Sequence, residues 1–248
     1  MGSVEARWSL QLLGFWQLRE VGEPVAVGMR QQRVIAIVAL LGARPRTVIA
    51  SRLWPESADA RAEANLRASL FRISHEQPGV IRRSADTIAL ERRVDVDVEA
   101  LRSTIGEVLT GDGRAMPAAS TAELSAAELL PGWYDDWVIF EQERLDQQRL
   151  GALEAMARAH LRQGEFDLAV EAAAAALAIE PLRESAQFLL LQAHLGAGNR
   201  AVAARVHQRF RDNLAAEMGL APSPRFAALI DAGTLYRELG TPARNRRR

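Results

Sequence analysis

The feature of this sequence that most limits its fold is an internal repeat with a period of 34 residues. The segment Ala159-His-Leu-Arg-Gln-Gly164 returns as Ala193-His-Leu-Gly-Ala-Gly198, and Ala169 and Ala203 keep the same register. A fixed period of this length indicates that one supersecondary unit is copied and that neighbouring copies stack on each other. The second half of the chain is therefore expected to be an array rather than a single closed core.

The period matches that of tetratricopeptide repeats, in which each unit is a pair of antiparallel helices. Small alanines let the paired helices approach closely, and a proline ends the second helix. After Ala203 the second copy loses the pattern, because His207 and Phe210 replace small residues. We expect everything from about residue 121 onward to be helical. The first copy has its further matching residues at Phe166, Ala176 and Pro181.

The first 100 residues follow a different order of predicted elements. Short alternating segments predict strands over 8–27, and apolar spacing predicts a helix over 30–41. Thr47 is the expected cap of a short second helix, which Pro55 ends. A third helix over 60–75 precedes a hairpin over 80–90. Strands, three helices and a hairpin in this order predict a winged helix, whose third helix enters the major groove of DNA while the hairpin, or wing, lies beside it.

The third helix suits this role chemically. Its apolar face is formed by Ala62, Leu66, Leu70 and Ile73, and the opposite face is polar. Arginine can bind guanine or phosphate, asparagine can read adenine, and alanine leaves room for close approach and can touch a thymine methyl. For the helix alone, a solvated amphipathic helix is the simpler interpretation, and the order of the surrounding elements favours DNA binding. The candidate DNA contacts are Arg61, Ala64, Asn65, Arg67, Ala68, Arg72, His75, Arg82 and Arg83.

Charge and composition exclude several classes of protein. The net charge is zero, yet residues 28–93 hold 12 arginines and 6 acidic residues, a net of +6. Such an excess favours a polyanion site but also arises by chance. Lysine is absent, which a bias of the source genome would explain. The absence of cysteine excludes a disulfide scaffold and a thiolate zinc site. With no membrane-spanning run and no signal-peptide pattern, we expect a cytoplasmic protein.

Several motifs in both halves of the chain point to one family. In the N-terminal half they are Leu12-Leu-Gly-Phe, Gln31-Gln-Arg-Val, Ile49-Ala-Ser-Arg-Leu-Trp54-Pro, and Asn65-Leu66 with Leu70, Arg72 and Ile73. In the C-terminal half they are Glu128-Leu-Leu-Pro-Gly-Trp-Tyr-Asp-Asp-Trp137-Val, Glu141-Gln-Glu-Arg-Leu, Gly164-Glu-Phe-Asp-Leu-Ala, Pro181-Leu-Arg-Glu-Ser-Ala and Glu217-Met-Gly-Leu-Ala-Pro-Ser-Pro224. By these motifs the N-terminal half resembles an OmpR-type winged helix in the version used by the antibiotic regulatory proteins of actinobacteria. The C-terminal half is similar to the bacterial transcriptional activator domain that accompanies it. The resemblance covers about residues 8–235.

The resemblance implies a transcription activator that binds direct repeats in double-stranded promoter DNA, as a homodimer, and engages RNA polymerase or its sigma factor. In related proteins the loop between the second and third helices carries the polymerase contacts. One departure weakens the DNA site: members commonly end the third helix with Arg-Leu-Arg-Arg, and here it reads Arg72-Ile-Ser-His75. Each lost phosphate contact lowers affinity and its salt dependence. In this chain the loop between the second and third helices, where related proteins contact the polymerase, contributes Pro55, Glu56, Ser57 and Asp59.

The sequence thus predicts a mainly α fold with a small β part (α+β). We expect a winged-helix domain over 1–105, a bacterial transcriptional activator domain with tetratricopeptide-like repeats over 106–240, and a disordered basic tail over 241–248. No nucleophile–base set and no Gly-x-x-x-x-Gly-Lys motif is present, so we expect no enzymatic activity, no cofactor and no metal. The alternative is a protein–protein adaptor whose winged helix has lost DNA binding.

Overall fold

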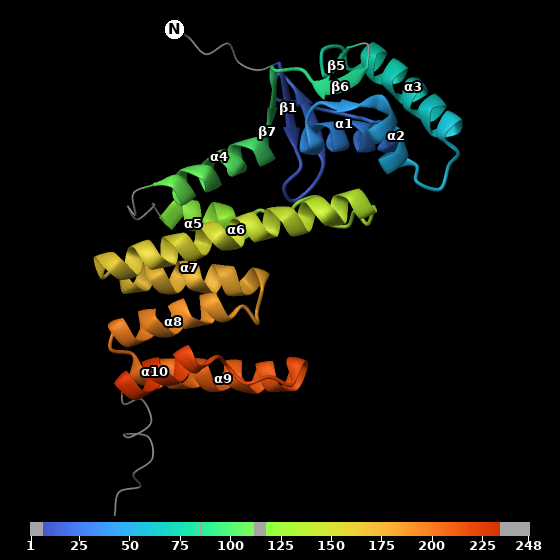
Figure 1. Ribbon diagram of the computed structural model, residues 1–248. Coiled ribbons are helices and arrows are strands. Elements are labelled where there is room, and N and C mark those ends of the chain that lie inside the picture. Colours follow the sequence, from blue (N-terminus) through green and yellow to red (C-terminus); the bar gives the residue numbers. More distant parts are fainter. Residues whose placement is uncertain (1–6, 85, 112–117, 234–248) are drawn as a thin grey trace, which may run out of the picture. The chain divides into compact units, whose positions relative to one another are not determined.

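The structure is a computed structural model that describes residues 7–84, 86–111 and 118–233 (Figure 1). Its fold class is the predicted one, mainly helical with a small β part at the N-terminal end. The chain forms two compact units, Met1–Ser103 with Ala126–Leu145 and Thr104–Ser125 with Asp146–Arg248. The predicted domain boundary at residue 105 stays a prediction, and residues 126–145 pack with the first unit. The predicted tail over 241–248 lies outside the described residues.

A four-stranded sheet forms one side of the first unit. Its strands are β1 (Trp8–Gln11), β2 (Gln17–Glu20), β3 (Glu23–Val25) and β7 (Val94–Val96), in the order β3-β2-β1-β7. In β1 the side chains of Trp8 and Leu10 are buried and those of Ser9 and Gln11 are partly exposed, which is the two-residue alternation of a sheet with one covered face. The expected strands are confirmed. Strand β7, which pairs in parallel with β1, was expected only as an exit segment.

Three helices and a second small sheet complete the winged helix. The helices are α1 (Met29–Leu41), α2 (Arg46–Leu53) and α3 (Asp59–Glu76), and the sheet has the order β4 (Arg44–Pro45), β6 (Thr87–Leu90), β5 (Ile81–Arg83). Helix α1 is the core element, because Val34 through Leu40 are all buried and the helix contacts α2, α3 and β6. The prediction of a Thr47 cap was wrong: α2 begins after Pro45 with no side-chain cap. Strand β4 pairs with β6, and α2 begins directly after this strand.

The segment after α5 (Ala118–Ala126) is bound to the first unit by backbone hydrogen bonds. The amide of Gly14 donates to the carbonyl of Glu128 at 2.7 Å, and that of Leu130 donates to Leu12 at 2.8 Å. The amides of Leu12 and Leu13 also donate to the carboxylate of Asp97, the first residue of α4 (Asp97–Thr110), at 2.9–3.0 Å. Burial raises the pKa of Asp97, and these hydrogen bonds only partly offset that effect.

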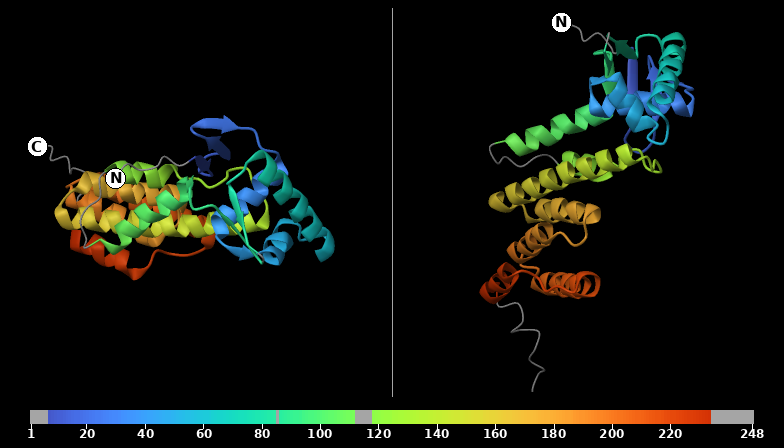
Figure 2. Two further views of the ribbon diagram at one scale, coloured as in Figure 1. Left: turned by 90° about the horizontal axis from the view of Figure 1, so that it is seen from above. Right: turned by 45° about the vertical axis from the view of Figure 1, so that its right-hand side comes forward.

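The second unit is a stack of helical hairpins (Figures 1 and 2). After α6 (Asp136–Gln163), which begins in the first unit, come α7 (Phe166–Ile179), α8 (Glu184–Gly196), α9 (Arg200–Met218) and α10 (Pro224–Gly233). The 34-residue repeat is confirmed as a repeat of geometry. Gly164 and Gly198 have φ of 74° and 76°, and the following amides donate to His160 at 2.9 Å and to His194 at 2.8 Å. Both copies therefore use the same left-handed turn between helices.

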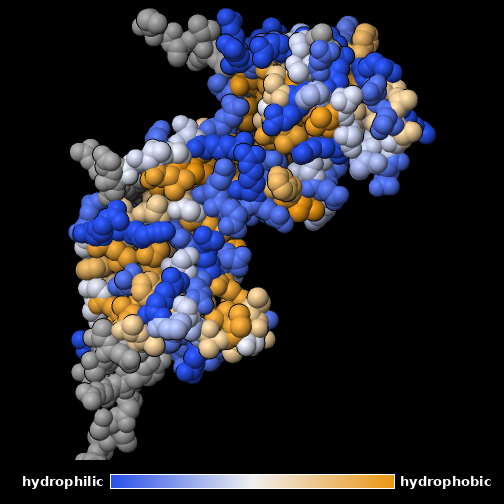
Figure 3. Space-filling view, viewed as in Figure 1, coloured by the Kyte–Doolittle hydropathy of each residue, from blue (hydrophilic) through white to orange (hydrophobic). Residues whose placement is uncertain are grey.

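Packing explains why the second copy departs from the alanine pattern. In α7 the side chains of Ala169, Ala172, Ala173 and Ala176 are fully buried, which lets the neighbouring helices approach closely. In α9 the ring of Phe210 lies 5.4 Å from that of Phe226 on α10. His207 stacks on the same ring at 5.7 Å. Larger side chains thus fill the space against the last helix. Apolar residues also reach the surface of the stack (orange in Figure 3).

Candidate nucleic-acid interface

Helix α3 has the buried face that its sequence predicted. The side chains of Ala62, Leu66, Leu70 and Ile73 are at most 3% exposed. Ser69 lies on the same face, and its hydroxyl donates to the carbonyl of Asn65 at 2.9 Å. This fixes the rotation of the helix, because apolar residues at three- and four-residue spacing must face the core. The residues between them therefore project away from the first unit's core.

The predicted contacts on α3 all reach solvent, but they do not form one row. Arg61, Asn65 and Arg72 share one flank, since they are four and seven residues apart. Arg67 lies on the other flank, where it lines a hollow of about 330 Å³ together with Arg46 and residues of α2. The exposed residues are Arg61, Ala64, Arg67, Ala68, Arg72 and His75, with Asn65 partly exposed.

Two of these arginines are held by weak ion pairs along the helix. Arg67 lies 3.9 Å from Glu63, and Arg72 lies 3.7 Å from Glu76. In both pairs each side chain is more than 40% exposed, so the pairs contribute at most about 1 kcal/mol each. Either guanidinium can exchange its carboxylate for a phosphate or a base edge at little cost.

The middle of the exposed face carries a residue that the sequence analysis missed. Phe71 is 72% exposed. It follows Ala64 and Ala68 and precedes His75 at three- and four-residue spacing, which places it directly opposite the buried face. The sequence signal that could have identified it is an aromatic residue on the otherwise polar face of the third helix. On a helix that enters the major groove, such a ring can contact a thymine methyl.

The wing is built from β5 and β6 and is anchored to α2. Arg82 and Arg83 are both exposed on β5, an edge strand. The turn is closed by Ser84, whose amide donates to the carbonyl of Thr87 at 3.0 Å. Arg46, the first residue of α2, donates a side-chain hydrogen bond to the carbonyl of Ser84 at 3.3 Å. Sequence reasoning missed Arg46, because its role depends on the non-local pairing of β4 with β6.

The predicted polymerase-contact loop lies beside an exposed aromatic surface within the first unit. Pro55, Glu56 and Asp59 are exposed and Ser57 is partly exposed; Asp59 is the first residue of α3. A hollow of about 490 Å³ adjoins Pro55 and is lined on its other side by the start of α6. The rim of this hollow includes Tyr134, which is 83% exposed, and Phe140, which is 60% exposed.

The described residues contain no metal centre and no membrane span. Among them, no group of three or more His, Cys, Asp or Glu side chains could hold a metal ion. No helix in this part of the chain is long and apolar enough to cross a membrane. The candidate site is instead an open surface of one helix and one hairpin, rich in arginine.

The chain thus combines a winged helix with a stack of helical hairpins. The model of the bacterial transcriptional activator domain matches residues 94–232, and the chain belongs to this family, as its motifs predicted. The regulatory protein AfsR of Streptomyces coelicolor is 28% identical over 218 residues, which are 82% of this chain and 22% of that protein. The AfsR of Streptomyces griseus is 30% identical over 233 residues, covering 84% and 22%.

The chain thus spans about a fifth of the length of these curated relatives. Among solved structures, that of Mycobacterium tuberculosis EmbR in complex with a low-affinity phosphopeptide superposes with a TM-score of 0.67. The match covers 92% of this chain and 65% of that one at 21% sequence identity. At this level of identity the likeness shows a common fold, including both the N-terminal region and the helical stack.

Proposed function

We propose that this chain is a sequence-specific DNA-binding regulator that activates transcription from promoters with direct repeats. The observation that carries the proposal is the exposed arginine-rich face of α3, supported from behind by a buried apolar face and flanked by the arginines of the wing. As a DNA-binding protein it acts in the cytoplasm, where bacterial chromosomes lie. The function requires no catalytic step.

In this proposal α3 enters the major groove. Arg61, Asn65 and Arg72 on one flank read base edges, and the small Ala64 and Ala68 permit the close approach. Arg72 gives up its weak pair with Glu76 when DNA is bound. Arg82 and Arg83 of the wing contact phosphates, and Arg67 does so from the opposite flank. Arg46 holds the wing tip against α2 and so fixes where the wing arginines lie.

A second surface serves the activation step. The loop residues Pro55, Glu56, Ser57 and Asp59 are proposed to contact RNA polymerase or its sigma factor. The exposed Tyr134 and Phe140 near this loop offer apolar area of the kind that protein interfaces bury. Binding to direct repeats would place two copies of the chain side by side on the DNA as a homodimer.

The adaptor alternative is supported by the end of α3. Ser74 and His75 are exposed where members of the family commonly have arginines, and the hydroxyl of Ser74 donates to the carbonyl of Phe71 at 2.8 Å. The helix therefore presents fewer cations toward DNA than its relatives do.

A salt series separates the two functions. Genomic binding sites are first mapped, and affinity for a mapped site is then measured by fluorescence anisotropy from low to moderate salt. The variant Arg61→Ala with Arg72→Ala is expected to bind at least about tenfold more weakly, because two base contacts are lost. The variant Arg82→Ala with Arg83→Ala, which removes two phosphate contacts, is expected to flatten the plot of log affinity against log salt by nearly two units. The control, Arg205→Ala with Arg209→Ala, removes two exposed charges from the second unit. Absence of binding at low salt, or an affinity of the Arg61→Ala, Arg72→Ala variant equal to that of the control, would favour the adaptor.

A further inference from the structure

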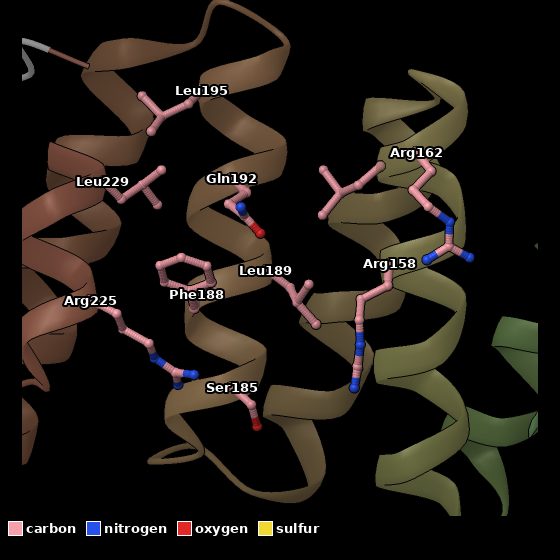
Figure 4. Close-up of a pocket in the computed structure, with 10 residues that line it drawn as sticks. Arg158, Arg162, Ser185, Phe188, Leu189, Gln192, Leu195, Arg225 and Leu229 are labelled. Carbon is pink, nitrogen blue, oxygen red and sulfur yellow. The ribbon is translucent and has the colours of Figure 1, made fainter. Parts of the chain in front are cut away.

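A groove of about 670 Å³ lies on one face of the helical stack of the second unit (Figure 4). Its lining comes from α6, α8 and α10, which are alternate helices of the stack. Helix α8 forms the floor, and α6 and α10 form the two walls, as the close-up shows. The groove is lined only by residues of the second unit and shares no residue with the proposed DNA and polymerase surfaces.

The floor of the groove is mainly apolar, with the amide of Gln192 between Phe188 and Leu195. Phe188, Gln192 and Leu195 follow one another at four- and three-residue spacing, so one face of α8 is turned toward the groove. Phe188 and Leu195 are partly exposed. On the wall formed by α10, Leu229 adds to the same apolar strip. A strip of this kind matches a row of apolar side chains on a partner helix.

The walls of the groove are cationic. Among the described residues that line the groove, every charged side chain is an arginine: Arg158 and Arg162 on α6, and Arg225 on α10. Arg225 is held in place, with its guanidinium 5.1 Å from the centre of the Phe188 ring. A cation stacked on a ring is oriented before any ligand arrives.

The carboxylates beside Arg158 and Arg225 do not fully neutralise these two arginines. Glu154 is 4% exposed and is shared by Arg183 at 2.5 Å, by Arg158 at 3.1 Å and by the hydroxyl of Ser185. Burial alone would raise the pKa of Glu154, but the hydrogen bonds and the two arginines outweigh it and the pKa lies below its usual value. One carboxylate therefore faces two guanidinium groups. Glu184, at 3.8 Å, is the acidic partner of Arg225. Arg158, Arg183 and Arg225 therefore share two carboxylates, which leaves a positive excess among these described residues.

We propose that this groove binds an acidic amphipathic helix of a partner protein. Apolar side chains of the partner at three- and four-residue spacing would cover the floor, and Asp or Glu on both of its flanks would reach the arginines of the two walls. Cations on both walls of an apolar floor fit this partner, because each side of such a helix can carry carboxylates.

A selection experiment tests the proposal with the full chain. A phage library of random dodecapeptides is selected against the wild-type protein, and the most enriched peptide is labelled and titrated by fluorescence anisotropy. Enriched peptides are expected to be rich in Asp and Glu and to carry Leu or Phe at three- and four-residue spacing. Arg162→Glu is expected to weaken binding about tenfold or more, and added salt to weaken it further. The matched control Arg209→Glu reverses an exposed charge outside the groove and is expected to bind like wild type.

Two results would overturn the proposal. The first is an enriched peptide set with no acidic excess, or one that binds equally to wild type and to Arg162→Glu. The second is a change of oligomeric state in Arg162→Glu by sedimentation, which would make the groove an interface between copies of the chain. A circular dichroism melt of each variant verifies folding. The readout involves no DNA, so its failure is distinguishable from a failure of the DNA-binding function.

Discussion

Arg33 of α1 forms an ion pair with Asp135, which stands 102 residues later, immediately before α6. The same guanidinium donates a hydrogen bond to the carbonyl of Leu53 at 2.9 Å, at the end of α2. One side chain therefore joins the core helix, the helix before the proposed polymerase loop and the start of the long α6. Both partners of the pair are only about a quarter exposed, at 25% and 27%.

Loss of this pair is expected to destabilise the first unit. Arg33→Ala should lower its free energy of unfolding by about 1–2 kcal/mol, because charge-assisted hydrogen bonds of a partly buried group are lost. All five tryptophans, from Trp8 to Trp137, lie in the first unit, so fluorescence in a urea titration reports on that unit. Arg30→Ala, an exposed change on the same helix, is the control. A double-mutant cycle with Asp135→Ala that gives no coupling would show that the pair is not the cause.

Phe71 is expected to act in DNA recognition rather than in stability. Because the ring is 72% exposed, Phe71→Ala should change the free energy of unfolding by no more than about 0.5 kcal/mol. Its affinity for a mapped DNA site should fall severalfold. Replacement of thymine by deoxyuracil in that site should weaken wild type more than Phe71→Ala, because the ring of Phe71 is the main proposed contact of the methyl group. Equal sensitivity of both proteins to the missing methyl groups would argue against this role.

Restoring cations at the end of α3 is expected to strengthen DNA binding. Ser74→Arg with His75→Arg should raise affinity at low salt and steepen the plot of log affinity against log salt by up to about 0.9 for each additional phosphate that the protein binds. The matched control adds the same two charges at Ala201 and Ala216, exposed residues of α9. If the control raises affinity as much as the α3 variant does, the effect is one of net charge and not of position.

Two helical glycines are expected to respond in opposite directions to alanine. A Cβ at Gly196 of α8 would lie 2.2 Å from the ring of Phe166, so Gly196→Ala should cost about 1–3 kcal/mol through overpacking. At Gly151 of α6 nothing lies within 4 Å of such a Cβ, and Gly151→Ala should stabilise by about 0.5–1 kcal/mol. Urea unfolding followed by far-UV circular dichroism measures both. Equal shifts of the two variants would contradict the packing between α7 and α8.

Acid is expected to weaken the end of the helical stack through His207. Burial, and secondly the charge of Arg211, lowers the pKa of His207 from 6.5. A histidine whose pKa is lower in the folded state gives stability that is full above about pH 6.5 and is lost as the pH falls below that value. His207→Phe keeps a ring against Phe226 and should reduce the stability difference between about pH 7.5 and pH 5.5. Burial also lowers the pKa of His194, so part of the pH dependence of stability should remain in His207→Phe.

Circular dichroism melts at the two pH values measure this dependence. His75→Gln, an exposed change on α3, serves as the control and should keep the wild-type difference. A pH dependence that is the same in His207→Phe and in wild type would contradict the assignment to His207.

The sequence by itself determined the helical stack and the orientation of α3. Helical hairpins contact mainly their neighbours, so their period survives as repeated Ala, His, Leu and Gly positions that mark the same turn at Gly164 and Gly198. The rotation of α3 followed from Ala62, Leu66, Leu70 and Ile73, because an apolar face at helical spacing can only turn inward.

Only the tertiary structure decided the features that join distant segments. The parallel pairing of β7 with β1, the Arg33–Asp135 pair and the packing of residues 126–145 with the first unit leave no periodic signal, since each depends on where the chain returns. The same holds for the groove, whose arginines come from α6 and α10 and meet only across the face of α8. A local pattern fixes which face of a helix is buried, and the assembled fold fixes which exposed side chains share a surface.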